Sequence, residues 1–302
     1  MHSALFIFSL VIIFALIFIG LFLNGFIFMK NVIDWLQGKR LQSIDIIMAS
    51  LGSVRIILVM QSAFRIFLVI FEEFRNLVKI YADYIITAQE FVEFCSLWWG
   101  TVLCVFYCVK ITNYSSSLFI KLKMRISGMV PRLLLGSMMV SLLSSLPYGW
   151  CVNSFHKVNS THIYNGTITE KIHLHINYVS VHIIIGVGSF VPFLIFCVAT
   201  FFLVVPLFKH TQNMSNNNIG FTKDQLDVLL IAIRNMVSFF IFYIFYFISG
   251  ILFPLSVQSD SPVFLLLCLI FLVAYPSLHS VVLIMSNVKL KQSIIDALHC
   301  LK

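Results

Sequence analysis

Apolar residues fill this chain in seven long runs that are separated by short polar segments. The runs cover residues 5–29, 44–70, 84–110, 130–150, 179–208, 226–253 and 263–285. A helix needs about 20 mostly apolar residues to cross a hydrocarbon core of about 30 Å, so each run is long enough. The apolar positions are continuous rather than alternating, which favours helices over the strands of a membrane barrel. The pattern therefore predicts an all-α membrane protein, a bundle of seven transmembrane helices.

The composition places the chain among integral membrane proteins. It is 60% hydrophobic and 11% charged, whereas a soluble domain carries about 25% charged residues. Because the runs and their connections use nearly the whole chain, we expect a single transmembrane domain over residues 1–302. Residues 5–29 follow no basic segment and are too long for the core of a cleaved signal peptide, so we interpret them as the first span.

The distribution of basic residues predicts the orientation of the bundle. If the N-terminus lies outside the cell, most lysines and arginines fall in inner loops and the C-terminal tail. The outer loops then hold only Arg75, Lys79, Lys157 and Lys171. Basic loops mark the cytoplasmic side, so we expect the N-terminus outside. Topology and the acidic headgroups of the lipid bilayer then account for the net charge of +8, and no nucleic acid is expected as a partner.

Two segments outside the runs have recognisable patterns. Residues 288–302 carry Leu290, Ile294, Leu298 and Leu301 at helical spacing between charged residues, which predicts a short amphipathic helix on the inner leaflet. The alternative is a frayed polar tail. Residues 210–220 read HTQNMSNNNIG, a polar tract that we expect to be mobile.

The connection over residues 151–177 is the longest loop on the predicted outer side. It contains two acceptor sequences for N-linked glycans, at Asn159 and Asn165, and their position agrees with the orientation derived from charge. The chain has seven cysteines, but most fall within the apolar runs, so no secreted-type disulfide framework is visible.

Arg55 lies near the middle of the second run, where a charge facing lipid costs roughly 2.5–3.5 kcal/mol. It must therefore face the bundle and bond to polar groups there. Asn24 in the first run and Ser280 in the seventh are plausible neighbours. We interpret these residues as an internal polar brace that changes between states.

Glu90 and Glu93 are three residues apart, so they share one face of the third helix. Gln89 adjoins them, and Gln61 and Arg65 lie at similar depth in the second run. One hypothesis is an outward-opening cavity that binds a ligand carrying positive charge or hydrogen-bond donors. The alternative is that Arg65 simply neutralises one glutamate.

The aromatic run 239–247 lies in the outer half of the sixth span. A tyrosine has a flat apolar ring and a polar tip, which suits a cavity wall. Only one side of the helix can face such a cavity, so we expect either Tyr243 or Tyr246 to line it, or each to line it in part.

Enzyme motifs are absent: the chain has no HExxH, GxSxG, P-loop or Rossmann glycine pattern. His173 and His175 lack a second pair of ligands, so no metal site is expected. We expect neither catalysis nor a cofactor.

Several segments resemble the bitter taste receptors, the type 2 taste receptors among G-protein-coupled receptors. The exit of the third span, residues 106–126, reads FYCVKITNYSSSLFIKLKMRI and is similar to the family pattern FYFLKIANFSxxxFLxLKxRI. Residues 279–293 read HSVVLIMSNVKLKQS and resemble HSxxLIxxNxKLK. Residues 43–58 read SIDIIMASLGSVRIIL and resemble IDxxLxxLAxSR, while PF at 192–193 and KHTQNM at 209–214 match further family positions.

The resemblance implies a plasma-membrane receptor for small, chemically diverse molecules that signals through a gustducin-like heterotrimeric G protein. Ligand contacts carried over by alignment are Arg65, Gln89, Glu93, His182, Tyr246 and Leu269. The family often has tryptophan at the position of Gln89 and asparagine at that of Glu93, and some members have an acid at that of Leu269. The comparison therefore implies that the acidic ligand contact lies in the third span of this chain rather than at the position of Leu269. The agonists of other family members are therefore not assigned to this chain.

The expected mechanism is a shift from a resting state to one that is open on the cytoplasmic side. We place Pro192, His279 and Ser280 with Asn24 and Arg55 in an activation network. The expected docking residues for the G protein are Lys110, Tyr114, Lys123, His210 and Lys289.

Three alternatives stay open. A chemosensory receptor of the vomeronasal type 1 class is the nearest. A small-molecule transporter predicts inverted repeats or a charged path through the midplane, and a membrane enzyme predicts clustered histidines or acids at one interface.

Overall fold

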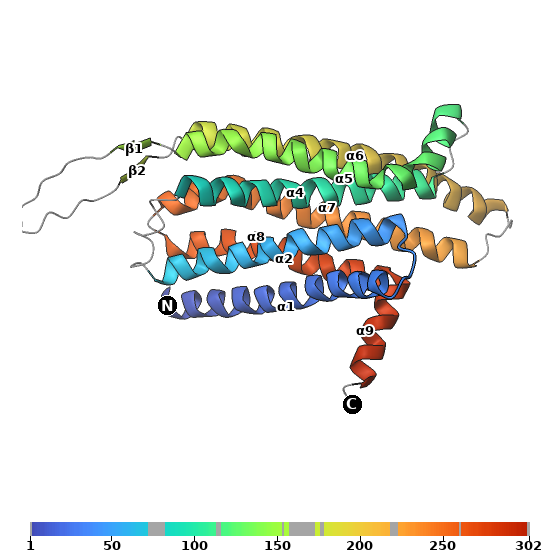
Figure 1. The fold of residues 1–302 in the computed structure, drawn as a ribbon, viewed down its shortest axis with the longest axis horizontal. Coiled ribbons are helices and arrows are strands. Elements are labelled where there is room, and N and C mark those ends of the chain that lie inside the picture. The colour runs from blue at the N-terminus through green and yellow to red at the C-terminus, as the bar shows by residue number, and fades with distance from the viewer. Residues whose placement is uncertain are drawn as a thin grey trace, which may run out of the picture.

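The computed structural model describes the backbone of residues 2–71, 82–112, 116–152, 154–156, 173–175, 178–217, 223–259 and 261–300. Long helices dominate this part of the chain (Figure 1). They are α1 (His2–Leu36), α2 (Ser43–Ile70), α4 (Ala82–Ile111), α5 (Ser117–Val152), α6 (Tyr178–Asn217), α7 (Lys223–Gln258), α8 (Pro262–Ser286) and α9 (Val288–Cys300). Seven of them, all but α9, are long and apolar enough to cross a membrane, which confirms the predicted bundle.

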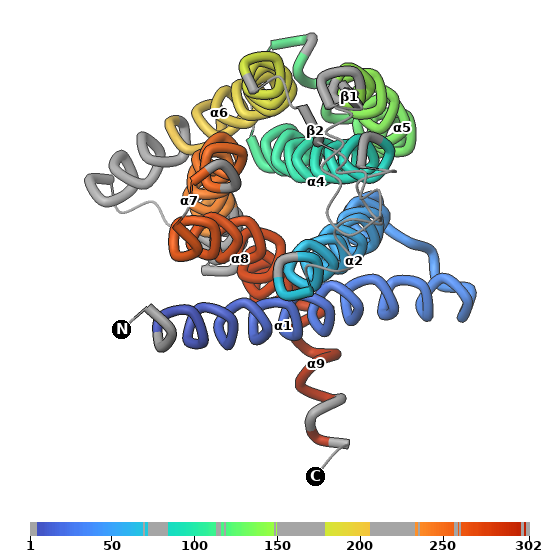
Figure 2. The backbone as a smooth tube through the Cα atoms, turned by 90° about the vertical axis from the view of Figure 1, so that its left-hand side faces the viewer, coloured from blue at the N-terminus to red at the C-terminus, as the bar shows by residue number. Residues whose placement is uncertain are grey.

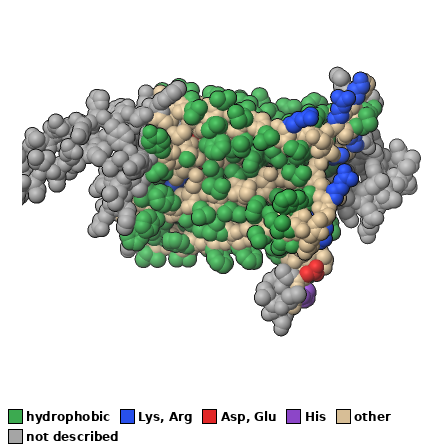
Figure 3. All heavy atoms as spheres, viewed as in Figure 1, with side chains coloured by type: hydrophobic (Ala, Val, Ile, Leu, Met, Phe, Trp, Pro, Cys, Tyr) green, Lys and Arg blue, Asp and Glu red, His purple; other side chains and the backbone are tan. Residues whose placement is uncertain are grey.

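The seven long helices run side by side, and α9 leaves the bundle at a steep angle (Figure 1). We call this the α9 end; α1 finishes and α2 begins there. Figure 2 looks along the bundle and shows α4 beside α2, α5 and α6, with α1 packed outside α2 and α8. The middle of the bundle exposes apolar side chains, whereas lysines and arginines gather at the α9 end (Figure 3). This distribution matches a belt of lipid around the helices.

Several helices extend beyond the predicted apolar spans. The first span was expected to end at residue 29, but α1 continues to Leu36. It stops in a Schellman motif: the N–H of Gly38 bonds to the carbonyl of Trp35, and that of Lys39 to the carbonyl of Asp34. Gly38 supplies the left-handed backbone that this motif requires, with φ of 75°. The apolar run marks the lipid-facing length, whereas the helix ends where the backbone turns.

The tract over 210–220, which the sequence predicts to be mobile, is helical over residues 210–217, because α6 continues to Asn217. Its residues there are polar but include neither proline nor glycine, so nothing in the sequence ends the helix before Gly220. Likewise α5 begins at Ser117, well before the predicted start at residue 130, and α7 continues to Gln258.

The predicted C-terminal helix is confirmed as α9. The side-chain oxygen of Asn287 accepts from the N–H of Leu290 at 3.1 Å and caps its first turn. Leu290 is buried, and Ile294 packs against the core that α1, α2, α4, α5 and α8 share. Its position on the inner leaflet stays a prediction.

The described part of the longest loop contains two short strands, β1 (Ser154–His156) and β2 (His173–His175), which pair antiparallel with Phe155 opposite Leu174. The two predicted glycan acceptors, Asn159 and Asn165, lie outside the described residues.

Close packing of α4 against α7 depends on a glycine. A Cβ atom on Gly100 would lie 2.6 Å from the Phe239 ring, so only glycine allows this approach. An aromatic cluster fills the space around it, including Phe196, Tyr243 and Tyr275.

Candidate functional site

Three helices bring polar side chains together in the half of the bundle away from the α9 end. Arg65 of α2 forms an ion pair with Glu93 of α4 through Nη2 and Oε1. Tyr246 of α7 donates its hydroxyl to the other carboxylate oxygen, Oε2, at 2.6 Å. We call these three residues the Arg65 cluster. The side chains of Arg65 and Glu93 are only 15% and 12% exposed, so the charges are largely desolvated.

The Arg65 cluster ties α2, α4 and α7 through one carboxylate. Each oxygen of Glu93 has a strong donor, which offsets much of the cost of taking the charge out of water. The pairing that the sequence left as an alternative, Arg65 with a glutamate, is present, and the partner is Glu93. The structure also places Tyr246 rather than Tyr243 against this carboxylate.

The Arg65 cluster keeps unused hydrogen-bonding capacity. Within the described residues, Nε of Arg65 and Oε1 of Gln61 are buried without a hydrogen-bond partner. Gln61 precedes Arg65 by one helical turn and shares its face of α2. Glu90 interacts electrostatically with Arg65 and Tyr246. A ligand with donors and acceptors would find partners here.

The remaining predicted ligand residues make contacts of different kinds. Gln89 is buried one turn from Glu93 on α4. His182 of α6 has Nε2 3.0 Å from the carbonyl of Ile251 in α7. The hydroxyl of Tyr243 donates to the carbonyl of Ser189 at 2.6 Å, and so holds α7 to α6. Leu269 is buried in an apolar cluster formed by α1, α2 and α8.

A second polar group occupies the middle of the bundle around Arg55, which is 0% exposed. Its Nη2 lies 2.7 Å from Nδ1 of His279 and 3.3 Å from the hydroxyl oxygen of Tyr275. The guanidinium also lies over the Tyr275 ring, 5.1 Å from its centroid. Because arginine can only donate, Nδ1 of His279 must accept, so the ring is neutral and carries its proton on Nε2.

The other residues of the predicted activation network form separate contacts. Asn24 accepts from the hydroxyl of Ser280 at 2.6 Å and donates to the carbonyl of Pro276 at 3.3 Å, which joins α1 to α8. The carbonyl of Pro192 accepts from the hydroxyl of Thr101 at 3.2 Å, which joins α6 to α4. The sequence reasoning missed Tyr275 and Thr101. Tyr275 precedes His279 by four residues, so helical spacing would have placed both on one face of α8.

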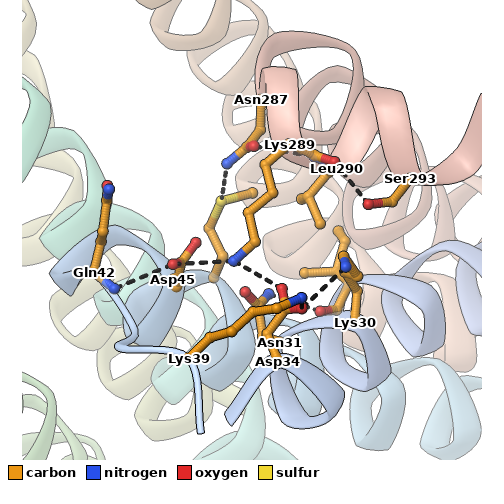
Figure 4. A network of polar contacts seen from close by, with 12 residues as sticks. Lys30, Asn31, Asp34, Lys39, Gln42, Asp45, Asn287, Lys289, Leu290 and Ser293 are labelled. Atoms are coloured by element: carbon orange, nitrogen blue, oxygen red, sulfur yellow. Dashed lines mark hydrogen bonds and ion pairs between the residues drawn. The ribbon is translucent and has the colours of Figure 1, made fainter. Parts of the chain in front are cut away.

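A third polar group lies at the α9 end, where five residues form what we call the α9 ion-pair cluster (Figure 4). Asp34 of α1 and Asp45 of α2 are its acids, and Lys30, Lys39 and Lys289 are its bases. The sequence reasoning missed both acids. Asp34 lies four residues after Lys30 beyond the apolar run, a spacing typical of an ion pair on a helix.

The predicted docking residues lie at this same end where they are described. Lys110 is exposed at the end of α4, and Nζ of Lys123 donates to the carbonyl of Thr112 at 3.1 Å. Lys289 is engaged in the α9 ion-pair cluster. Tyr114 lies outside the described residues, as does the side chain of His210.

Comparison with known proteins agrees with this architecture. The family model described as "Taste receptor protein (TAS2R)" matches residues 1–302. The chain is 31% identical to human taste receptor type 2 member 2 over 290 residues, which are 94% of this chain and 93% of that protein. It is 31% identical to member 39 of Macaca mulatta over 91% of this chain and 81% of that protein. It is 29% identical to human member 8 over 94% of this chain and 93% of that protein.

The family match spans the whole chain, and its relatives cover nearly the same length. With seven helices able to cross a membrane in the described part of the chain, the protein is a multi-pass membrane protein. The chain therefore belongs to the type 2 taste receptor family.

Proposed function

We propose that this protein is a plasma-membrane bitter taste receptor that binds small molecules beside the Arg65 cluster and activates a gustducin-like heterotrimeric G protein at the α9 end. One observation carries the proposal: side chains of α2 and α7 converge on the carboxylate of Glu93 in α4. A ligand that changes the partners of Glu93 changes how three helices are held together.

The charges favour a cationic ligand. The carboxyl groups of Glu90 and Glu93 both lie near the guanidinium of Arg65, which leaves one carboxyl group in excess in a largely desolvated region. A ligand with an ammonium group would favour the ionised form of that carboxyl group and pair with it. It would do so beside Glu90 or by replacing Arg65 as the partner of Glu93.

Contacts run from the Arg65 cluster to the middle of the bundle. The ring of Tyr246 lies 4.9 Å from that of Tyr275, between centroids, and the hydroxyl of Tyr275 meets Arg55. Tyr246 and Tyr275 belong to α7 and α8, which pack together. We infer that a ligand which moves Tyr246 shifts the position of Tyr275 and hence the contacts of Arg55 with α8. Agonism requires that the ligand bind the active arrangement more tightly than the resting one.

The proposal is tested in cells that express the receptor with a promiscuous G protein. A chemically varied library of bitter compounds should contain agonists that release calcium, and the release should require both receptor and G protein. Flux of a compound across the membrane without G protein would favour a transporter instead.

A further inference from the structure

Lys289, in the first turn of α9, lies between carboxylates of two other helices. Its Nζ is 3.0 Å from Oδ2 of Asp34 in α1 and 3.1 Å from Oδ2 of Asp45 in α2 (Figure 4). The side chains of Asp34 and Asp45 are 1% and 8% exposed, whereas Lys289 is 38% exposed. The acids are thus buried at the helix junction, and the lysine reaches down to them from α9.

Both acids are fixed by other contacts as well. Oδ1 of Asp34 accepts from Lys30 at 3.0 Å and from Lys39 at 2.9 Å. Oδ2 of Asp45 accepts from the backbone N–H of Gln42 at 3.1 Å, as part of the capping box of α2. The carboxylates therefore form a rigid, preorganised binding site for an ammonium group.

The two carboxylates favour the charged form of Lys289. Desolvation lowers the pKa of Lys289, but hydrogen bonds and charge attraction from Asp34 and Asp45 outweigh it, so the pKa lies above its ordinary value. The ion pairs are therefore present at neutral pH, and on the alkaline side they are lost as the pH rises through that elevated pKa.

The neighbouring lysine of α9 has no comparable environment. Lys291 is exposed, and its side chain makes no ion pair within the part of the chain that the structure describes. The two lysines share a helix and a charge, so Lys291 provides a matched control.

We propose that Lys289 is a positioning residue: its ion pairs with Asp34 and Asp45 fix α9 against the ends of α1 and α2, and thereby set the surface that the G protein meets. This inference rests on the proposed function and changes the expected role of Lys289 from a docking contact to an internal one. Only Asn287 separates α9 from α8, and its Nδ2 lies 3.3 Å from the sulfur of Met48 in α2. The position of α9 is therefore tied to the junction of α1, α2 and α8.

The first test measures the position of α9 without any signalling. Spin labels on the exposed residues Leu36 of α1 and His299 of α9 report their separation in the receptor reconstituted in nanodiscs. Wild type and Lys291→Met should give one narrow distance distribution, and Lys289→Met a broad one. A distribution for Lys289→Met as narrow as that of wild type would overturn the inference.

The second test separates positioning from direct contact. Lys289→Met and Asp45→Asn should each reduce the maximal agonist response at equal surface expression, and the double variant should be no worse than the more affected single variant. The amide introduced by Asp45→Asn keeps an oxygen for the Gln42 N–H, so the helix cap is retained. If the two losses multiply, Lys289 acts independently of Asp45, and the inference fails.

The two tests distinguish this inference from the proposed function. If no variant, wild type included, activates a G protein, the proposed function fails while the distance measurement still decides the position of α9. If agonists act normally on Lys289→Met although α9 is displaced, α9 is positioned as inferred but is not needed for coupling, which contradicts the inferred role.

Discussion

Glu93 is the residue on which the ligand site depends most. It accepts from Arg65 and Tyr246, and no other described contact joins α2, α4 and α7 through one side chain. Its negative charge pairs with Arg65, and its second carboxylate oxygen accepts from the hydroxyl of Tyr246. Charge and geometry therefore contribute separately to the site. Two substitutions can separate the contributions.

Replacing Glu93 by glutamine should weaken cationic agonists more than neutral ones. The amide keeps an acceptor for Tyr246 but removes the charge, and breaking a buried ion pair costs about 3–5 kcal/mol at most sites. Because Glu93 and Arg65 are partly exposed, we expect less than this, about 1.4 kcal/mol or more, which is about tenfold or more in the half-maximal concentration of a cationic agonist. Calcium dose–response curves for a matched cationic and neutral pair give the measurement.

Tyr246→Phe is the control, since it removes one hydrogen bond and leaves the charges unchanged. It should shift both agonists by a similar factor. Equal losses for both agonists in the glutamine variant would reject a charge-based role for Glu93.

The sequence predicted part of the polar interior at this scale. A charge inside an apolar run must have a partner, so Arg55, Arg65 and Glu93 could be identified from their positions alone. Tyr275 was missed because an aromatic residue in an apolar run has the same pattern whether it bonds to an arginine or packs in the core; only its spacing of four residues from His279 pointed to it. Asp34 was missed because it lies after the apolar run ends, where a charge has no apparent cost.

The ends of the helices follow backbone chemistry rather than hydropathy. The apolar runs located all seven spans, because lipid contact requires continuous apolar residues. They underestimated α1, α5, α6 and α7, whose ends continue past those runs. Polar residues can continue a helix in water, so the end is decided by signals such as Gly38.

Gly38→Ala should destabilise the receptor by about 1 kcal/mol. The φ of 75° is a left-handed conformation that glycine adopts readily and that alanine adopts only with steric strain from its Cβ atom. The purified protein should show a lower midpoint of thermal unfolding. Gly136→Ala is the matched control: that glycine is helical, and a Cβ atom there meets nothing within 4 Å. Alanine at 136 should be neutral or stabilising by about 0.4–1 kcal/mol. An unchanged midpoint for Gly38→Ala would mean that the Schellman motif does not hold the end of α1.

At the scale of the whole molecule, the α9 end of the bundle differs chemically from its middle. Basic side chains gather at the α9 end, and the described face of the middle is apolar (Figure 3). The positive-inside rule then predicts that the α9 end lies in the cytoplasm and the Arg65 cluster in the outer half. The proposed function requires this orientation, since ligands arrive from outside and the G protein from inside.

Glycosylation offers an independent test of orientation. If the loop of residues 151–177 is extracellular, glycans attached at Asn159 and Asn165 should slow migration in a gel, and a glycosidase should remove the shift. Replacing both asparagines by glutamine should abolish the shift. A shift that persists in the double variant, or an Asn159 segment that impermeant labels reach only from the cytosol, would contradict the assigned orientation.

The central claim is that occupation of the outer half of this bundle activates a G protein at the α9 end. The most direct measurement is agonist-stimulated nucleotide exchange by a purified gustducin-like heterotrimer with the receptor in nanodiscs, using a cationic agonist found in the library screen. We expect exchange to rise with agonist concentration in wild type, and to need about tenfold or more additional agonist in Glu93→Gln. Nucleotide exchange in wild type that does not change with agonist concentration, or an identical concentration dependence in both proteins, would contradict the account.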